Sequence, residues 1–201
     1  FEKAVSLDPE NVDARLYLME FYRRAPGIVG GSLTKAREQA EEVKKRNPYQ
    51  GHVVLGALYE DDEQYQLAEK EYLAAVQLRP DSSSAYFSLG SLYTTTKQYD
   101  KAFEAYEQVL RVNPRAVRAY YQIGRVSALS GKRLDEGEQS LKTFLQHEPR
   151  DADSWLSAAH WRLGMIYEKQ GKNDLARNEY EASLRLDPNR KEAAEALENL
   201  R

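Results

Sequence analysis

A short phrase recurs along this chain at nearly constant spacing, and it constrains the fold more than any other feature. Each copy has an aliphatic residue, a glycine directly after it, and a tyrosine or serine three residues after the glycine. The copies begin at Leu55-Gly56, Leu89-Gly90, Ile123-Gly124 and Leu163-Gly164. Each is followed by a small residue and later by a proline: Ala68 and Pro80, Ala102 and Pro114, Gly137 and Pro149, Ala176 and Pro188. A period of roughly 35 residues predicts a stack of similar supersecondary units rather than one globular core.

The residues around this phrase form rows that predict pairs of helices. Two rows stand four residues apart and share one face of a first helix: Leu18, Leu55, Leu89, Ile123 and Leu163, then Tyr22, Tyr59, Tyr93, Ser127 and Tyr167. Between them runs the row Met19, Gly56, Gly90, Gly124 and Gly164. A glycine inside a helix costs about 1 kcal/mol relative to alanine, and close approach of a second helix would explain it. That second helix supplies the small residues Ala36, Ala68, Ala102, Gly137 and Ala176, and one turn later the large residues Tyr72, Tyr106, Leu141 and Tyr180.

These rows resemble the tetratricopeptide repeat, a helix–turn–helix unit, and the match covers almost the whole chain. The resemblance implies an all-α fold, a right-handed α-solenoid of stacked antiparallel helix pairs (a superhelix). It also implies a non-catalytic scaffold for protein–protein interaction, with a protein or peptide ligand in the concave groove. It does not name the partner.

The repeat pattern predicts twelve helices and the following boundaries. We expect residues 1–11 to hold the second helix of a truncated repeat, 12–48 a first repeat with an inserted loop, 49–82, 83–116 and 117–151 the second to fourth repeats, 152–188 a fifth repeat with an extended first helix, and 189–201 a capping helix.

Two departures from the regular pattern lie in the first and fifth repeats. The inserted loop is Pro26–Ser32, where glycines allow unusual backbone angles and Ser32 or Thr34 caps the next helix. Ile28 and Val29 in this loop either pack onto the neighbouring unit or contact a partner. In the fifth repeat, Trp155, Ala159, Leu163 and Tyr167 are spaced four apart, which lengthens the first helix by over one turn.

Composition and motifs argue against several classes of function. With 29 basic and 32 acidic residues the net charge is -3, which gives no general attraction to nucleic acid. Apolar runs are far shorter than the roughly 20 residues that direct membrane insertion needs, and there is no cysteine. The Gly27–Ser32 loop lacks the lysine and the preceding strand of a phosphate-binding loop. His52, His147 and His160 show no metal-ligand spacing. We therefore expect no catalytic residues, no cofactor and no metal.

A partner-binding surface is expected on the first helices of the later repeats. The resemblance places on the concave side the row two residues before the repeated leucine: Leu16, Val53, Phe87, Tyr121 and Trp161. Aromatic residues and arginine are enriched at binding hot spots. The predicted contact residues are Phe87, Arg118, Tyr121, Arg125, Trp161 and Arg162, and the expected ligand combines apolar anchors with acidic residues. In the alternative interpretation, the aromatics pack against the next unit and the arginines are solvated or paired.

Two other functions stay open from the sequence. One is a self-association module whose main partner is another copy of the chain. Phe1, Val5 and Leu7 support it, because they match a second helix that lacks its partner helix. The other is an auxiliary domain of a larger enzyme or envelope machine.

Overall fold

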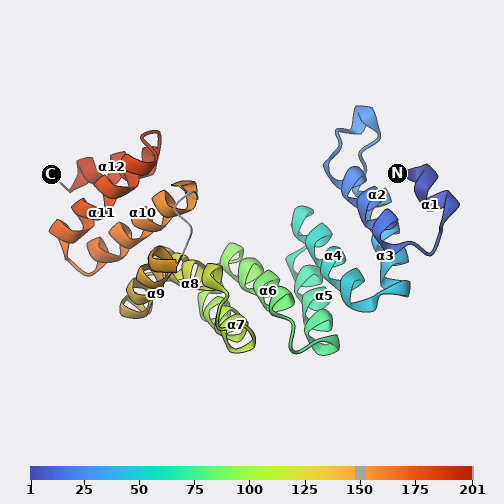
Figure 1. Ribbon diagram of the computed structural model, residues 1–201, viewed down its shortest axis with the longest axis horizontal. Coiled ribbons are helices and arrows are strands. Elements are labelled where there is room, and N and C mark those ends of the chain that lie inside the picture. Colours follow the sequence, from blue (N-terminus) through green and yellow to red (C-terminus); the bar gives the residue numbers. More distant parts are fainter. Residues whose placement is uncertain (148–152, 201) are drawn as a thin grey trace. The chain divides into compact units, whose positions relative to one another are not determined.

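The structure is a computed structural model that describes residues 1–147 and 153–200 (Figure 1). In these residues it contains twelve α-helices, one short 3-10 helix and no strand. The all-helical fold and the number of helices agree with the sequence prediction. The chain forms two compact units, Phe1–Thr96 and Lys97–Arg201.

The helices of the first unit are α1 (Glu2–Leu7), α2 (Val12–Arg24), the 3-10 helix η1 (Gly27–Val29), α3 (Leu33–Arg46), α4 (Pro48–Asp61), α5 (Tyr65–Leu78) and α6 (Ser83–Thr95). The helices of the second unit are α7 (Tyr99–Val112), α8 (Val117–Ser130), α9 (Leu134–His147), α10 (Asp153–Lys169), α11 (Asn173–Leu186) and α12 (Lys191–Asn199).

Within each unit, a helix packs mainly on its neighbours in sequence. In the first unit α2 packs on α3, α3 on α4, α4 on α5 and α5 on α6. In the second unit the same holds from α7 to α12 where contacts are described, and α8 also contacts α10. This nearest-neighbour packing is the defining property of repeat folds.

Glycines in the first helices allow tyrosines of the second helices to approach closely. A Cβ atom built on Gly56 would stand 2.4 Å from Cε1 of Tyr72, and one built on Gly164 would stand 2.4 Å from Cε1 of Tyr180. Both tyrosines are buried, at 2% and 0% exposure. The ring therefore occupies the space that a larger residue would need, as the rows of the sequence predicted.

The buried tyrosines also bind the helix on which they pack. The Tyr72 hydroxyl donates to a carboxylate oxygen of Glu60 at 2.5 Å, and the Tyr180 hydroxyl donates to Glu168 at 2.7 Å. Each glutamate stands four residues after the glycine, so ring and hydroxyl contact the same helical face. Burial, followed by these hydrogen bonds, raises the pKa of both tyrosines well above the ordinary value.

The inserted loop of the first unit is an ordered turn with an apolar tip. Gly30 has φ +100, and a Cβ on Gly31 would stand 1.7 Å from the carbonyl oxygen of Ala25, so both positions require glycine. Ser32 caps α3, as expected, by accepting from the backbone N–H of Lys35. Ile28 is 96% exposed. The interpretation that Ile28 packs onto the neighbouring unit is therefore wrong.

The extended helix of the fifth repeat is α10. It has 17 residues, whereas α8 and α11 have 14 each, so it is longer by about one turn. Pro149 and the predicted boundary between residues 151 and 152 lie outside the described residues. Within residues 1–147 and 153–200, no helix has both the length and the apolar character needed to cross a membrane.

We predict that Gly164→Leu strongly destabilises the protein. The new side chain would overlap the buried Tyr180 ring, and overpacking of this kind costs about 1–3 kcal/mol or more. Gly27→Leu is the matched control, because nothing lies within 4 Å of a Cβ at that position. Urea unfolding of both variants checks this, and equal midpoints for the two would contradict the packing role of Gly164.

We also predict a tyrosine-dependent loss of stability at alkaline pH. The pKa of Tyr180 is higher in the folded protein than the value of about 10 in an unfolded chain. Its stabilisation is thus present below about pH 10 and is lost as the pH rises above it. Tyr180→Phe should flatten the fall in unfolding free energy between about pH 9 and pH 11. Tyr17→Phe, which removes the hydroxyl of a 66% exposed tyrosine, is the control variant.

Candidate functional site

Three arginines and three aromatic rings follow one another along one continuous strip in the second unit. We call it the aromatic–arginine strip, and its members in spatial order are Arg118, Trp155, Tyr121, Arg162, Trp161 and Arg190. Arg118 and Tyr121 come from α8, Trp155, Trp161 and Arg162 come from α10, and Arg190 directly precedes α12.

The spacings along the strip are those of cation–π and edge-on aromatic contacts. Cζ of Arg118 lies 5.4 Å from the ring centroid of Trp155, whose ring meets that of Tyr121 edge-on at 5.0 Å. Cζ of Arg162 lies 5.4 Å from the Tyr121 centroid and 4.7 Å from the Trp161 centroid. Cζ of Arg190 lies 6.0 Å from the same Trp161 centroid. Each of these distances is within the range of a favourable contact.

The buried neighbours of the strip hold it in place. Tyr121 is only 5% exposed and packs on Phe144 of α9, with ring centroids 5.1 Å apart. Nε of Arg190 donates to the Ser157 hydroxyl at 2.7 Å. Ser157 and Ser183 in turn exchange reciprocal hydrogen bonds between α10 and α11, each hydroxyl donating to the other's carbonyl oxygen. The strip is therefore built on a fixed backbone frame.

Arg162 carries a charge that nothing in the described protein neutralises by direct contact. Its Nε is buried without a hydrogen-bond partner, and its Nη1 donates only to the carbonyl oxygen of Ala158, at 3.5 Å. Among the described residues it forms no ion pair with a carboxylate. Burial lowers its pKa most, and the charges of Arg125 and Arg190 lower it too, whereas Tyr121 and Glu192 act in the opposite direction.

Arg162 is half-buried, and of its guanidinium nitrogens Nε is enclosed without a partner. Partial burial of an unpaired ion is unfavourable, and a cation–π contact recovers about 0.5–2 kcal/mol. The rings of Tyr121 and Trp161 supply such contacts but no counter-charge. Arg118 and Arg125 also lack an ion pair with any described residue, and Arg125 donates to the side chain of Gln122 at 3.3 Å.

The structure brings together most of the residues that the sequence proposed as a partner-binding site. Arg118, Tyr121, Trp161 and Arg162 belong to the strip, and Arg125 exerts its charge on Arg162. Phe87 lies on α6 in the first unit and is half-buried. Burial of Tyr121 matches the alternative interpretation for that one residue, in which the aromatic packs within the fold. The partner-binding role of the six residues stays a prediction.

Two members of the strip were not among the predicted site residues. Trp155 is 38% exposed and stands in the extra turn of α10, outside the regular row of the repeat. Arg190 follows α11 and reaches the strip only because α12 turns back along α11. The available signal for Trp155 was its place in the four-residue spacing with Ala159 and Leu163.

Two histidine–glutamate pairs were also missed. Nδ1 of His52 lies 2.6 Å from a carboxylate oxygen of Glu71, and Nδ1 of His160 lies 2.6 Å from Glu179. The partners stand on the two helices of one pair, so local spacing could not reveal them. Each histidine has one carboxylate, and no group of three metal-binding side chains occurs in residues 1–147 and 153–200. These pairs connect α4 to α5 and α10 to α11.

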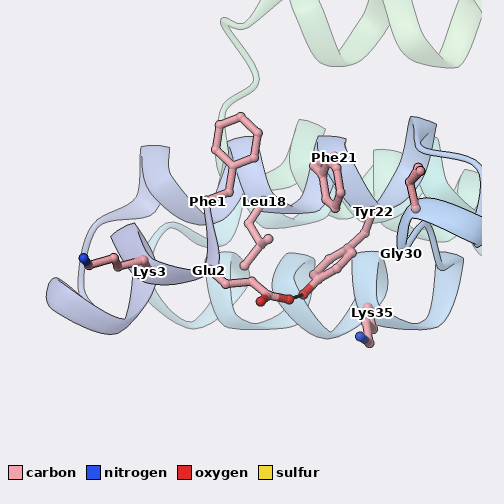
Figure 2. A pocket seen from close by; sticks show the side chains of 9 residues that line it. Phe1, Glu2, Lys3, Leu18, Phe21, Tyr22, Gly30 and Lys35 are labelled. Carbon is pink, nitrogen blue, oxygen red and sulfur yellow. Dashed lines mark hydrogen bonds between the residues drawn. The ribbon is translucent and has the colours of Figure 1, made fainter.

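The first unit has a pocket of its own, of about 490 Å³, between α1, α2, α3 and the inserted loop (Figure 2). Its lining combines the apolar or aromatic side chains of Phe1, Leu18, Phe21, Tyr22 and Val29 with the charged side chains of Glu2, Lys3 and Lys35. Figure 2 shows Glu2 reaching across to the Tyr22 hydroxyl, which donates to it. This hydrogen bond is the largest cause that raises the pKa of Tyr22 to about 12.

Comparisons with known proteins agree with this architecture. Three family models described as tetratricopeptide repeat match residues 50–115, 98–152 and 157–190. A search of curated protein sequences found no match.

Solved structures of tetratricopeptide repeat (TPR) proteins share the fold. YrrB, a TPR protein with an unusual peptide-binding site, has a TM-score of 0.71 at 16% identity, over 97% of this chain and 96% of YrrB. PilF of Pseudomonas aeruginosa has a TM-score of 0.71 at 21% identity, over 96% of this chain and 84% of PilF. A chain of the APC/C hetero-tetramer Cut9–Hcn1 has a TM-score of 0.78 at 14% identity, where the match covers 99% of this chain and 38% of that chain. The repeated glycine–tyrosine helix pairs, the stacking of each helix on its neighbours and the matching family models together show that this chain belongs to the tetratricopeptide repeat family.

Proposed function

We propose that this chain is a non-catalytic scaffold that binds a segment of a partner protein on the aromatic–arginine strip of its second unit. One observation carries the proposal: the strip combines partly exposed tryptophans with two arginines, Arg118 and Arg162, that have no ion pair among the described residues. Tryptophan and arginine are the side chains that most often dominate binding energy. Peptide binding by YrrB, a protein of the same fold, supports the general class of function.

The chemistry of the strip defines the preferred ligand. The partly exposed faces of Trp155 and Trp161 suit apolar side chains, and the planar guanidinium of Arg118 suits a carboxylate held by two parallel hydrogen bonds. The ligand should therefore combine apolar anchors with acidic residues. Tyr121 is buried, so it contributes by holding Trp155 and Arg162 in position.

The test uses a phage-displayed library of short random peptides, selected on the purified chain. We predict that selected peptides carry apolar and acidic residues and that their binding weakens with added salt, because salt screens the exposed arginines. Trp161→Ala should weaken binding by about 2 kcal/mol or more, as measured by calorimetry. Leu129→Ala, at a 42% exposed residue of α8 outside the strip, should bind as the parent chain does.

The proposal fails if no peptide is selected. It also fails if Trp161→Ala and Arg118→Ala both remain folded by circular dichroism and bind the selected peptide with unchanged affinity.

Self-association is a second candidate function, supported by the apolar surface of the first unit. Phe1 and Tyr17 are each 66% exposed and Val29 is 59% exposed, and these three residues line two neighbouring hollows. Ile28, next to Val29 at the tip of the inserted loop, is 96% exposed. Exposed apolar patches of this kind mark interaction surfaces.

Light scattering over a concentration series tests this candidate. If it is right, the average mass rises with concentration, and Ile28→Asp keeps the chain monomeric. The control is Leu78→Asp, at a 50% exposed leucine at the end of α5, which should associate as the parent does. A constant monomer mass at all concentrations would eliminate self-association.

A further inference from the structure

The unpaired guanidinium of Arg162 is the feature of the strip that the general scaffold proposal leaves unexplained. A buried ion normally acquires a counter-ion, because protein and water otherwise leave its charge poorly solvated. Other buried arginine nitrogens without a partner, Nε of Arg37 and Nε of Arg46, belong to side chains that are already paired with carboxylates through their other nitrogens. Arg162 has no such pair among the residues that the structure describes.

The charges around Arg162 are mostly positive, and the one carboxylate that acts on it, Glu192, forms no ion pair with it among the described residues. Arg125 on α8 and Arg190 before α12 both act on it as like charges, and Arg190 shares the Trp161 ring with it. Arg190 is partly compensated, since Asp187 lies 3.4 Å away. Arg125 has only an amide partner, Gln122. Three arginines from different parts of the chain, Arg125, Arg162 and Arg190, thus act on one another. Among the described residues, direct ion pairing to a carboxylate is found for Arg190 alone of these three.

The aromatic rings fix the direction from which a counter-ion can approach. Tyr121 and Trp161 each lie within cation–π distance of the Arg162 guanidinium, at 5.4 Å and 4.7 Å. A ring contact uses the face of the guanidinium and leaves its in-plane N–H groups free for hydrogen bonds. Arg162 keeps partial solvent exposure, so a small anion can reach these groups.

We propose that Arg162, with Arg125 and Arg190 beside it, is an oxyanion subsite that receives the carboxylate or phosphate group of the partner segment. The inference rests on the proposed function, because it names the group of the partner that the strip binds. The guanidinium donates hydrogen bonds to two oxygens of the anion in its own plane, and the adjacent arginines supply further attraction. Binding of the anion pairs a charge that the free protein leaves unpaired, so it should stabilise the folded second unit.

The chain's own tryptophan fluorescence can report binding at this subsite. Its two tryptophans, Trp155 and Trp161, are both members of the strip. Their fluorescence therefore reports an anion bound at Arg162 without any label. The probes are sodium acetate and sodium phosphate, each compared with sodium chloride at equal ionic strength so that screening is the same.

We expect acetate or phosphate to change the tryptophan fluorescence saturably and to raise the thermal unfolding midpoint, whereas chloride does neither to the same extent. Arg162→Met should weaken this binding by about tenfold or more, as loss of a hydrogen bond to a charged group predicts. Without added anion, Arg162→Met should be at least as stable as the parent, because an apolar side chain replaces an unpaired, half-buried charge. Arg185→Met, at an exposed arginine of α11, should respond to the anions as the parent does.

A stronger response to phosphate would support the subsite and assign it to phosphorylated partners, and a stronger response to acetate would support it and assign it to acidic side chains. Equal responses of the parent and Arg162→Met to every anion would overturn the subsite. So would a large loss of stability in anion-free Arg162→Met, because it would show that the charge is already satisfied. The outcome is separable from the scaffold proposal: peptides that bind the strip while no anion binds Arg162 refute only the subsite, and anions that bind while no peptide is selected refute only the scaffold function.

Discussion

The close contact between the two helices of each pair is the constraint on which the described structure depends. Gly56 and Gly164 remove the side chain at the point where Tyr72 and Tyr180 lie across the first helix. The tyrosine then gains a second anchor, a glutamate one turn after the glycine, at 2.5 Å and 2.7 Å. Packing fixes the separation of the helices, and the hydrogen bond fixes the position of the ring along them. The pairs α4–α5 and α10–α11 are held in this way, whereas in α8–α9 the glycine Gly124 faces Leu141 instead of a tyrosine.

The aromatic–arginine strip is formed mainly by residues of α8 and α10. Phe144 packs on Tyr121, and the reciprocal serine hydrogen bonds connect α10 to α11, so the helices that carry the rings are fixed against their neighbours. Its arginines, by contrast, have few acceptors of their own. The strip thus combines aromatic rings with two arginines, Arg118 and Arg162, that have no ion pair among the described residues, and the proposed partner binding rests on this combination.

The sequence predicted the fold well because the repeat encodes it locally. The glycine and tyrosine rows, the helix-ending prolines and the small residues of the second helix all constrain neighbours within one period, and this is where the structure agrees best with expectation. The site was harder to predict, since it depends on contacts between repeats. Trp155 reaches Tyr121 because α10 has an extra turn, and Arg190 reaches Trp161 because of the path of the chain after α11. The exposure of Ile28 was also not predictable, because the inserted loop closes on its own backbone through Gly31 rather than on a neighbouring helix.

The central claim is that a partner segment contacts the strip in the second unit. The most direct measurement is a two-dimensional amide NMR titration of the labelled chain with a selected peptide, in which the chain's two tryptophans give two indole N–H signals. Contact with the strip predicts saturable shifts of both indole signals, together with backbone amides of α8 and α10. Shifts confined to residues of the first unit, such as those lining the pocket between α1 and α2, with both indole signals unmoved, would contradict it.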